Sequence, residues 1–195
     1  MAISQAIEEH QAIIGQLMQT CLPDIEKLAS LCSRILLNDH TIFFCGNGGS
    51  AADSQHLAAE IVGRFQTERR ALKAVALTTD TSILTALGND YGYDRIFARQ
   101  VEALARPGDL LIGFSTSGNS KNVLLAMETA KEFGAKTAGL TGQDGGQMET
   151  LCDICVKVPS KVTARVQEAH ILIGHAICAE IDKAEADLRR GIYYV

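Results

Sequence analysis

Four hydroxyl groups occur within six consecutive residues, 115–120, whose sequence is STSGNS. An apolar run, LLIGF, precedes the segment, and a helix-forming stretch, KNVLLAMETAKEF, follows it. Unpaired N–H groups at the start of a helix attract anions, and hydroxyl donors complete a binding site for phosphate. An ordinary helix cap needs only one such residue. We therefore predict a phosphate-binding loop whose hydroxyls come from Ser115, Thr116, Ser117 and Ser120.

A second loop, GNGGS, follows another apolar run, TIFFC. Its glycines lack a Cβ atom, which lets the backbone approach a ligand, and the Asn47 amide can bond to sugar hydroxyls. A tight turn from strand to helix also favours glycine, so the hydroxyl-rich loop is what favours ligand binding here. Neither loop has the glycine spacing or the glycine–lysine pair of the common nucleotide-binding motifs. A phosphorylated metabolite is the better ligand class.

Histidine and carboxylate side chains lie on two stretches with helical periodicity. His56 and Glu60 are four residues apart, so they share one helix face and can share a metal ion or a proton. A solvated polar pair is the alternative. The apolar neighbours of the pair and the glycine loop before it favour a functional site.

The last predicted helix carries Gln167, His170 and His175 among many aliphatic residues. Histidines on apolar helices are usually hydrogen-bonded core residues. Gln167 and His175 are ~12 Å apart along a straight helix, whereas Gln167 and His170 are one turn apart. The spacing leaves open which of these side chains bind one metal ion.

Short apolar strands alternate with helices along the chain, which predicts βαβ units and a parallel sheet covered on both faces. The predicted fold is a three-layer α/β sandwich, in which ligands bind beyond the carboxyl ends of the strands. Apolar periodicity over residues 7–22 and 25–37, with Pro23 between them, predicts an N-terminal helical hairpin. We expect one domain over residues 1–195, with the hairpin in 1–38 and the α/β core, ending in a helix over about 163–186, in 39–195.

Composition narrows the cellular role. The chain has 195 residues, 47% of them hydrophobic, which suits a single core. Its net charge of −5 argues against binding to nucleic acid. No apolar run reaches the roughly 20 residues of a membrane span, and the first residues lack the features of a signal peptide. We expect a cytoplasmic protein without a membrane partner.

Six cysteines are scattered through the hydrophobic segments, which is typical of buried thiols. Cys152 and Cys155 form a CxxC pair, but no second CxxC or close histidine pair follows it. Ile154, Val156 and Val158 alternate around the pair as in a strand. The pattern favours structural cysteines and leaves any further role of the pair open.

Five segments, in this order, resemble the bacterial phosphoheptose isomerases of the sugar isomerase (SIS) domain family: CGNGGSAADSQHLAAEIVGRF, LGNDYGYD, GFSTSGNS, LTGQDGG and ARVQEAHILIGHAI. The resemblance covers nearly the whole chain. It implies the conversion of D-sedoheptulose 7-phosphate, a phosphorylated seven-carbon sugar, into D-glycero-D-manno-heptose 7-phosphate. That reaction begins the synthesis of ADP-heptose for the lipopolysaccharide core. A homotetramer and one bound zinc ion per subunit are also implied.

The resemblance also implies roles for individual residues. Glu60 and His175 correspond to the catalytic base and acid. The metal ligands implied are His56, Glu60, Gln167 and His175. Residues implied to contact the substrate, besides the hydroxyl loop, are Asn47, Gly48, Gly49, Glu60, Asn89, Asp90 and Gln167. From the residues alone, Asn89 and Asp90 are common loop formers before a glycine. Ala164 stands where some members carry an aspartate, so no role is transferred to it.

Two alternatives differ from this function. One is a non-catalytic SIS-domain protein that binds the replication initiator. In that branch, the resemblance implies, the positions of Glu60 and His175 hold residues that cannot transfer protons. This chain keeps Glu60 and His175, which argues against the alternative. The other is an isomerase or sensor of a different phosphosugar that uses the same phosphate loop.

Overall fold

The computed structural model of the chain describes residues 2–191, which contain a parallel five-stranded sheet with strand order β2-β1-β3-β4-β5. All residues of β1 and β3 are buried, as expected for apolar strands covered on both faces. The predicted parallel sheet is confirmed. The strands are β1 (Ile42–Gly46), β2 (Ala74–Ala76), β3 (Leu110–Ser115), β4 (Lys136–Thr141) and β5 (Ile154–Lys157).

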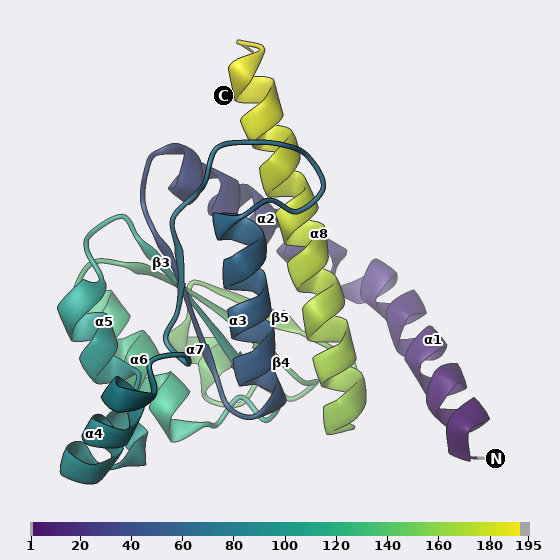
Figure 1. Cartoon of the computed structure of the whole chain (residues 1–195). Helices are drawn as coiled ribbons and strands as arrows, with labels where there is room; N and C mark the ends of the chain where they lie inside the picture. Colours follow the sequence, from purple (N-terminus) through teal and green to yellow (C-terminus); the bar gives the residue numbers. More distant parts are fainter. Residues whose placement is uncertain (1, 192–195) are drawn as a thin grey trace.

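Helices cover both faces of the sheet and complete the predicted three-layer sandwich (Figure 1). Alternate residues along a strand point to opposite faces of the sheet and pack against different helical layers. Phe44 packs with residues of α2, α3 and α8, whereas Phe43 packs with residues of α5 and α6. Among the described residues, no helix is both long enough and apolar enough to cross a membrane. The α-helices are α1 (Ala2–Thr20), α2 (Leu22–Leu37), α3 (Gly49–Val62), α4 (Thr81–Tyr91), α5 (Ala98–Leu104), α6 (Lys121–Glu132), α7 (Met148–Leu151) and α8 (Thr163–Arg189).

The strand order reverses between β1 and β3, which pair with each other while their following strands lie on opposite sides. Ligands of open α/β sheets bind at such a point, beyond the carboxyl ends of the strands. The loop after β1 contains Asn47 and Gly48, and the loop after β3 contains residues 116–120. The fold therefore places both predicted binding loops at one crevice.

The N-terminal region differs from the predicted hairpin. Both helices are present, but only Cys21 separates α1 from α2, and its backbone is helical at φ −111° and ψ −14°. A single residue is too short to reverse the chain. Pro23 lies in the first turn of α2, where its missing N–H group costs no helical hydrogen bond. Helix α2 packs against the core, while α1 extends outward past α8 with Ile13 and Leu17 buried (Figure 1).

Asn89 and Asp90 also differ from the expected loop. Both lie in the last turn of α4, which ends at Gly92 with φ 83°. No residue of α4 is buried. The 3₁₀-helix at Tyr93–Arg95 and the short helix α5 follow, and neither was predicted from the sequence. Segments of three and seven residues are too short to show a clear period.

His170 on α8 is a core residue, as its apolar surroundings predicted. It is fully buried, its Nε2 lies 3.2 Å from the carbonyl oxygen of Thr141, and its ring packs on Phe114 at 5.8 Å. Burial lowers the pKa of His170 to about 4, and the contact with Thr141 opposes this only in part. The imidazole is therefore neutral in the folded protein near neutral pH.

This burial predicts a loss of stability in mild acid. Between pH 6.5 and about 4 the unfolded chain binds a proton at His170 that the folded chain does not, so the free energy of unfolding falls as the pH falls. The expected loss from this group is roughly 3 kcal/mol. Urea unfolding at several pH values measures it. A His170→Gln variant should lack most of that pH dependence, and an unchanged dependence would contradict the assignment.

Candidate active site

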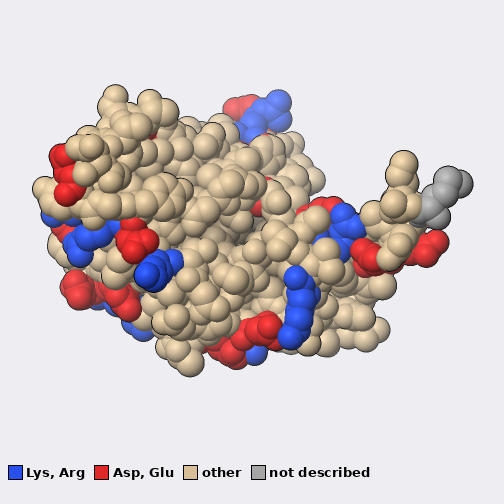
Figure 2. Space-filling model, turned by 90° about the horizontal axis from the view of Figure 1, so that it is seen from below, with Lys and Arg blue, Asp and Glu red and all other residues tan. Residues whose placement is uncertain are grey.

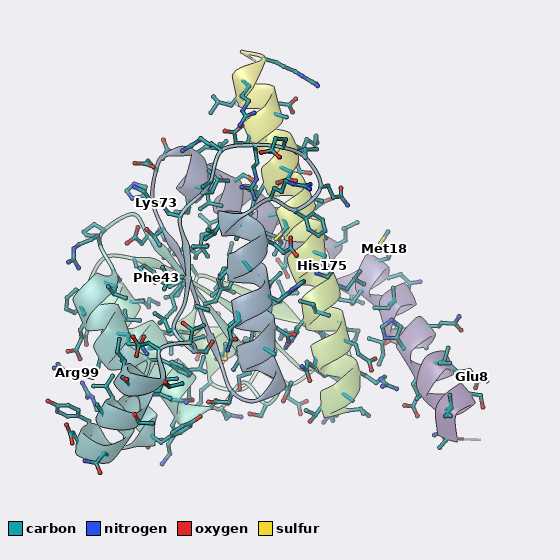
Figure 3. All side chains as sticks on the ribbon, viewed as in Figure 1. Glu8, Met18, Phe43, Lys73, Arg99 and His175 are labelled. Carbon is teal, nitrogen blue, oxygen red and sulfur yellow. The ribbon has the colours of Figure 1, made fainter. Side chains whose placement is uncertain are left out.

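The acid–base candidates come together where α3 and α8 lie side by side and run in the same direction (Figures 1 and 3). The Nε2 atoms of His56 and His175 are 2.8 Å apart, so the two rings share a hydrogen bond. Glu60 Oε1 lies 3.6 Å from His56 Nε2. The ring of Phe65 stacks on His175 at 5.4 Å. A carboxylate and two imidazoles thus converge on one point.

Two glycines permit the close approach of these helices. A Cβ atom on Gly174 would lie 2.5 Å from Leu57 Cδ1, and one on Gly49 would lie 2.1 Å from Gln167 Nε2. Gln167 therefore lies against the first turn of α3, where it also hydrogen-bonds Asp53. Three of the four predicted metal ligands, His56, Glu60 and His175, lie together. The fourth, Gln167, instead contacts Gly49 and Asp53.

Asp53 was not singled out from the sequence, although it completes this face of α3. Its side chain is buried, and its Oδ2 atom has no hydrogen-bond partner among the described groups. Burial raises the pKa of Asp53, against the opposing effects of the Gln167 hydrogen bond and the neighbouring His56. The spacing of Asp53, His56 and Glu60 (i, i+3, i+7) marks one helix face and was the signal that could have revealed it.

The donor set suits a zinc ion in its chemistry, because two imidazole nitrogens and a carboxylate are common zinc ligands. The described side chains do not, however, form a group of three His, Cys, Asp or Glu arranged to hold a metal. Nitrogens bound to one tetrahedral zinc lie about 3.3 Å apart, whereas the two Nε2 atoms lie 2.8 Å apart. His56 and His175 fit a metal after a small separation of the rings. The orphaned acceptor on Asp53 points to a further cation or donor nearby.

The glycine loop is tied to its neighbours by amide groups. Asn47 Nδ2 donates to Asn122 Oδ1 at 2.9 Å, and Asn122 Nδ2 donates to Asn47 Oδ1 at 2.8 Å. The hydroxyl of Tyr93 also donates to Asn47 Oδ1, at 3.0 Å. Gly48 has φ 57°, a conformation that favours glycine. Asn122 and Tyr93 were not predicted as site residues, and nothing in their spacing indicated the contact.

In the hydroxyl loop the side chains converge on each other. Ser115 Oγ lies 2.9 Å from Ser120 Oγ and 3.4 Å from Ser117 Oγ. Ser120 is the N-cap residue of α6, yet its side chain makes no capping hydrogen bond. Ser115 Oγ accepts from the Ser120 amide at 3.3 Å and Ser117 Oγ accepts from the Asn119 amide at 3.2 Å, so these two hydroxyls also stabilise the loop itself. Figure 2 views this end of the molecule, where charged side chains lie mostly around the rim and the middle is largely uncharged.

Asn89 and Asp90 do not join this group within one chain. They are exposed, and Asn89 Nδ2 donates to Asp90 Oδ1 at 2.7 Å. Helix α4 lies well away from α8 in Figure 1. Their implied contact with the substrate stays a prediction.

A buried ion pair fixes the loop after α3 onto α8. Arg69 Nε donates to Asp182 Oδ1 at 2.6 Å, and both side chains are almost fully buried. The same guanidinium donates to the carbonyl oxygens of Glu60 and Ile61 at the end of α3. Burial raises the pKa of Asp182, but hydrogen bonds from the Thr67 and Gln66 amides and from Arg69 outweigh it, so the pKa is lowered. The carboxylate is ionised near neutral pH.

The fold and the paired loops define a protein of the SIS class. The SIS domain model matches residues 6–142, and the chain belongs to this family. The phosphoheptose isomerase of Aliarcobacter butzleri is 58% identical over 181 residues, which cover 93% of this chain and 96% of that protein. That of Nitratiruptor sp. is 54% identical over 182 residues, 93% of this chain and 97% of its own.

Solved structures agree with these relatives. The phosphoheptose isomerase from Neisseria gonorrhoeae superposes with a TM-score of 0.89 at 45% identity, covering 93% of this chain and 97% of that one. The phosphoheptose isomerase from Francisella tularensis gives a TM-score of 0.90 at 37% identity, with the same coverage. The predicted fold and the resemblance to this family are confirmed.

The Arg69–Asp182 pair predicts a large effect of a single truncation. Asp182→Ala leaves the guanidinium buried without its partner, so the free energy of unfolding should fall by about 3–5 kcal/mol. Urea denaturation of both proteins measures the difference. Glu128→Ala, which truncates an exposed carboxylate on α6, is the matched control and should change stability by less than about 0.5 kcal/mol. Equal effects of the two substitutions would refute the role of the pair.

Proposed function

We infer that this chain is a phosphoheptose isomerase that converts D-sedoheptulose 7-phosphate into D-glycero-D-manno-heptose 7-phosphate. The observation that carries the inference is the convergence of Glu60, His56 and His175 in a chain that is 58% identical to a phosphoheptose isomerase. Incubation of the purified protein with sedoheptulose 7-phosphate, followed by NMR, tests it directly. Formation of an aldose heptose phosphate supports the inference, and an unchanged ketose contradicts it.

The hydroxyl loop binds the phosphate and holds the far end of the sugar. Ser115, Ser117 and Ser120 present converging hydroxyls at the start of α6, whose first N–H groups add a positive potential. Thr116 lies in the same loop. Anchoring the phosphate fixes C1 and C2 of the sugar beside the acid–base group and reduces the entropy cost of reaction.

Glu60 and His175 transfer the protons. Glu60 removes a proton from C1 of the ketose, which gives an enediol, and the proton returns at C2 to give the aldose. His175 moves a proton between the two oxygens, and its Nε2 lies 2.8 Å from His56 Nε2. The amide of Asn47 and the backbone at Gly48 and Gly49 bind the sugar hydroxyls.

A zinc ion is part of the proposal, held by His56, Glu60 and His175, with Gln167 as the fourth residue implied. When bound, the ion would polarise the sugar carbonyl and stabilise negative charge on oxygen. The buried Oδ2 of Asp53 and the N, N, O donor set support a cation here. A carboxylate that binds metal tightly is a poor base, so Glu60 would serve as the base only in the form that is not bound to the ion.

The proposal extends to assembly and pathway. A homotetramer is supported by apolar side chains that the chain leaves exposed on α1 and around α4: Ile3, Ile7, Ile83, Tyr91 and Tyr93. Asn89 and Asp90 would then reach a site through a second subunit. The reaction belongs in the cytoplasm, as the first step of ADP-heptose synthesis for lipopolysaccharide.

Removal of the base predicts loss of turnover with substrate binding kept. Glu60→Gln preserves the shape of the side chain, so kcat should fall by about 10²–10⁴-fold while the affinity for sedoheptulose 7-phosphate changes little. Steady-state kinetics and a binding titration measure the two quantities. A kcat within a factor of about two of wild type would remove Glu60 from the mechanism.

Removal of two loop hydroxyls predicts the opposite pattern. Ser117→Ala combined with Ser120→Ala should raise KM far more than it lowers kcat, because each hydrogen bond to a charged phosphate contributes about 1.5–3 kcal/mol. The matched control is Thr129→Ala, which removes a hydroxyl from the far part of α6 where it bonds to Leu125 O. If the affinities for substrate and inorganic phosphate both stay at the wild-type value, the loop is not the phosphate site.

The metal proposal predicts that protein purified without chelator contains about one zinc per subunit. His56→Ala combined with His175→Ala should give folded, metal-free protein without turnover, whereas His40→Ala, outside the site, should keep its metal. Elemental analysis and circular dichroism measure metal content and folding. An active wild-type enzyme that contains no metal and is unaffected by a strong chelator would rule out this role, and leave Glu60 and His175 as an acid–base pair.

A further inference from the structure

The CxxC pair differs from the other cysteines of the described chain. Cys21, Cys32, Cys45 and Cys178 are buried, as the sequence predicted, but Cys152 and Cys155 are only half-buried. Both residues are therefore partly exposed to solvent. Cys152 follows α7, and Cys155 lies on β5, at the edge of the sheet.

The two sulfur atoms lie over the same glycine. A Cβ atom built on Gly139 of β4 would be 3.2 Å from the Sγ of Cys152 and 3.7 Å from the Sγ of Cys155. Gly139 and Cys155 are also direct partners in the parallel ladder. The missing Cβ leaves a space that both sulfur atoms border.

The surroundings give the two thiols different roles. The neighbouring Cys152 thiol and the Thr141 hydroxyl outweigh burial and lower the pKa of the Cys155 thiol. The Cys155 sulfur, together with burial, raises the pKa of Cys152. Lys157 favours the Cys155 thiolate, and Glu149, which pairs with Lys157, opposes it. Cys155 is thus the better nucleophile, and Cys152 carries the proton.

We propose that Cys152 and Cys155 are a redox-active dithiol that a hydroperoxide converts into a reversible intrachain disulfide. The Cys155 thiolate attacks the peroxide, whose O–O bond breaks to release an alcohol or water, and a sulfenic acid forms on Cys155. The Cys152 thiol then attacks that sulfur, a disulfide forms, and water leaves. The peroxide is reduced by the two electrons that the thiols lose, and an added dithiol reverses the change by exchange.

Helix α7 connects this pair with the hydroxyl loop. At its end, Cys152 Sγ donates to the carbonyl oxygen of Met148 at 2.9 Å, a hydrogen bond that the disulfide removes. At its start, the Met148 amide donates to the Gly118 carbonyl oxygen at 3.1 Å, and the Gln147 amide donates to Asn119 Oδ1 at 3.1 Å.

The backbone before α7 packs tightly against the backbone of the hydroxyl loop. A Cβ on Gly118 would lie 1.9 Å from the Gly145 carbonyl oxygen. Displacement of α7 therefore moves residues 118–119. Oxidation of the dithiol weakens anion binding at the loop, and this second part of the proposal rests on the proposed phosphate site.

The thiol chemistry is tested without measuring activity. Folded, reduced protein is treated with hydrogen peroxide and then with iodoacetamide, and trypsin releases a peptide of residues 137–157 that holds Cys152 and Cys155 but no other cysteine. We expect this peptide to lose two hydrogen atoms and to escape alkylation until dithiothreitol is added. A peptide that remains fully alkylated, or one oxidised without a cross-link, overturns the proposal.

Single variants assign the two roles. In Cys152→Ser the serine hydroxyl keeps a donor beside Cys155, so dimedone should trap a sulfenic acid on Cys155. In the matched variant, Cys155→Ser, Cys152 should react with peroxide far more slowly. Equal labelling of the two variants contradicts the assigned order of attack.

The link to the loop is tested with inorganic phosphate, followed by phosphorus NMR. Oxidised protein should bind phosphate roughly two- to tenfold more weakly than reduced protein, the effect of about one neutral hydrogen bond. The double variant Cys152→Ser, Cys155→Ser should show no change on peroxide treatment. Equal affinities in the wild type overturn the link. Reduced protein that binds no phosphate contradicts the phosphate site and the link with it, while the peptide result still decides the disulfide.

Discussion

The contact between α3 and α8 is the constraint on which the candidate site depends. Gly174 gives Leu57 room, and the Arg69–Asp182 pair fixes the loop after α3 on the later turns of α8. Both helices run in the same direction, so side chains on successive turns of one helix meet those of the other in order. The hydrogen bond between His56 and His175 is a product of that register.

The candidate site has one part with ionisable side chains and one part with neutral side chains. The candidate acid–base residues stand on α3 and α8, whereas the proposed anion site consists of neutral hydroxyl donors and the start of α6. The reciprocal amide bonds between Asn47 and Asn122 join the two parts, because Asn47 follows β1 and Asn122 begins α6. This bridge crosses the point where the strand order reverses. The two loops are thereby held at a fixed separation by the Asn47–Asn122 side-chain bridge as well as by β1 and α6.

The sequence predicted the fold because its apolar strands and helices alternate with clear periods, and it placed both loops at the carboxyl ends of β1 and β3. It could not predict features that depend on contacts between distant segments. The pairing of Arg69 with Asp182, 113 residues apart, leaves no periodic signal. The break between α1 and α2 at Cys21 was predicted as a hairpin. Pro23 indicates that the helical pattern is interrupted, but it does not indicate the angle between the two helices. Asp53 was detectable from its spacing with His56, yet only the structure shows that its Oδ2 is buried without a hydrogen-bond partner among residues 2–191.

The position of α4 bears on how the site is completed. Asn89 and Asp90 stand on a helix without buried residues, far from the histidines of the same chain, and they bond to each other. A helix with exposed Ile83 and nearby Tyr91 and Tyr93 gains little stability from its own core. Burial of this apolar surface against another subunit would stabilise α4 and place its polar end beside a neighbouring crevice. Under the proposed assembly, the contact that buries this surface would also bring Asn89 and Asp90 to a site.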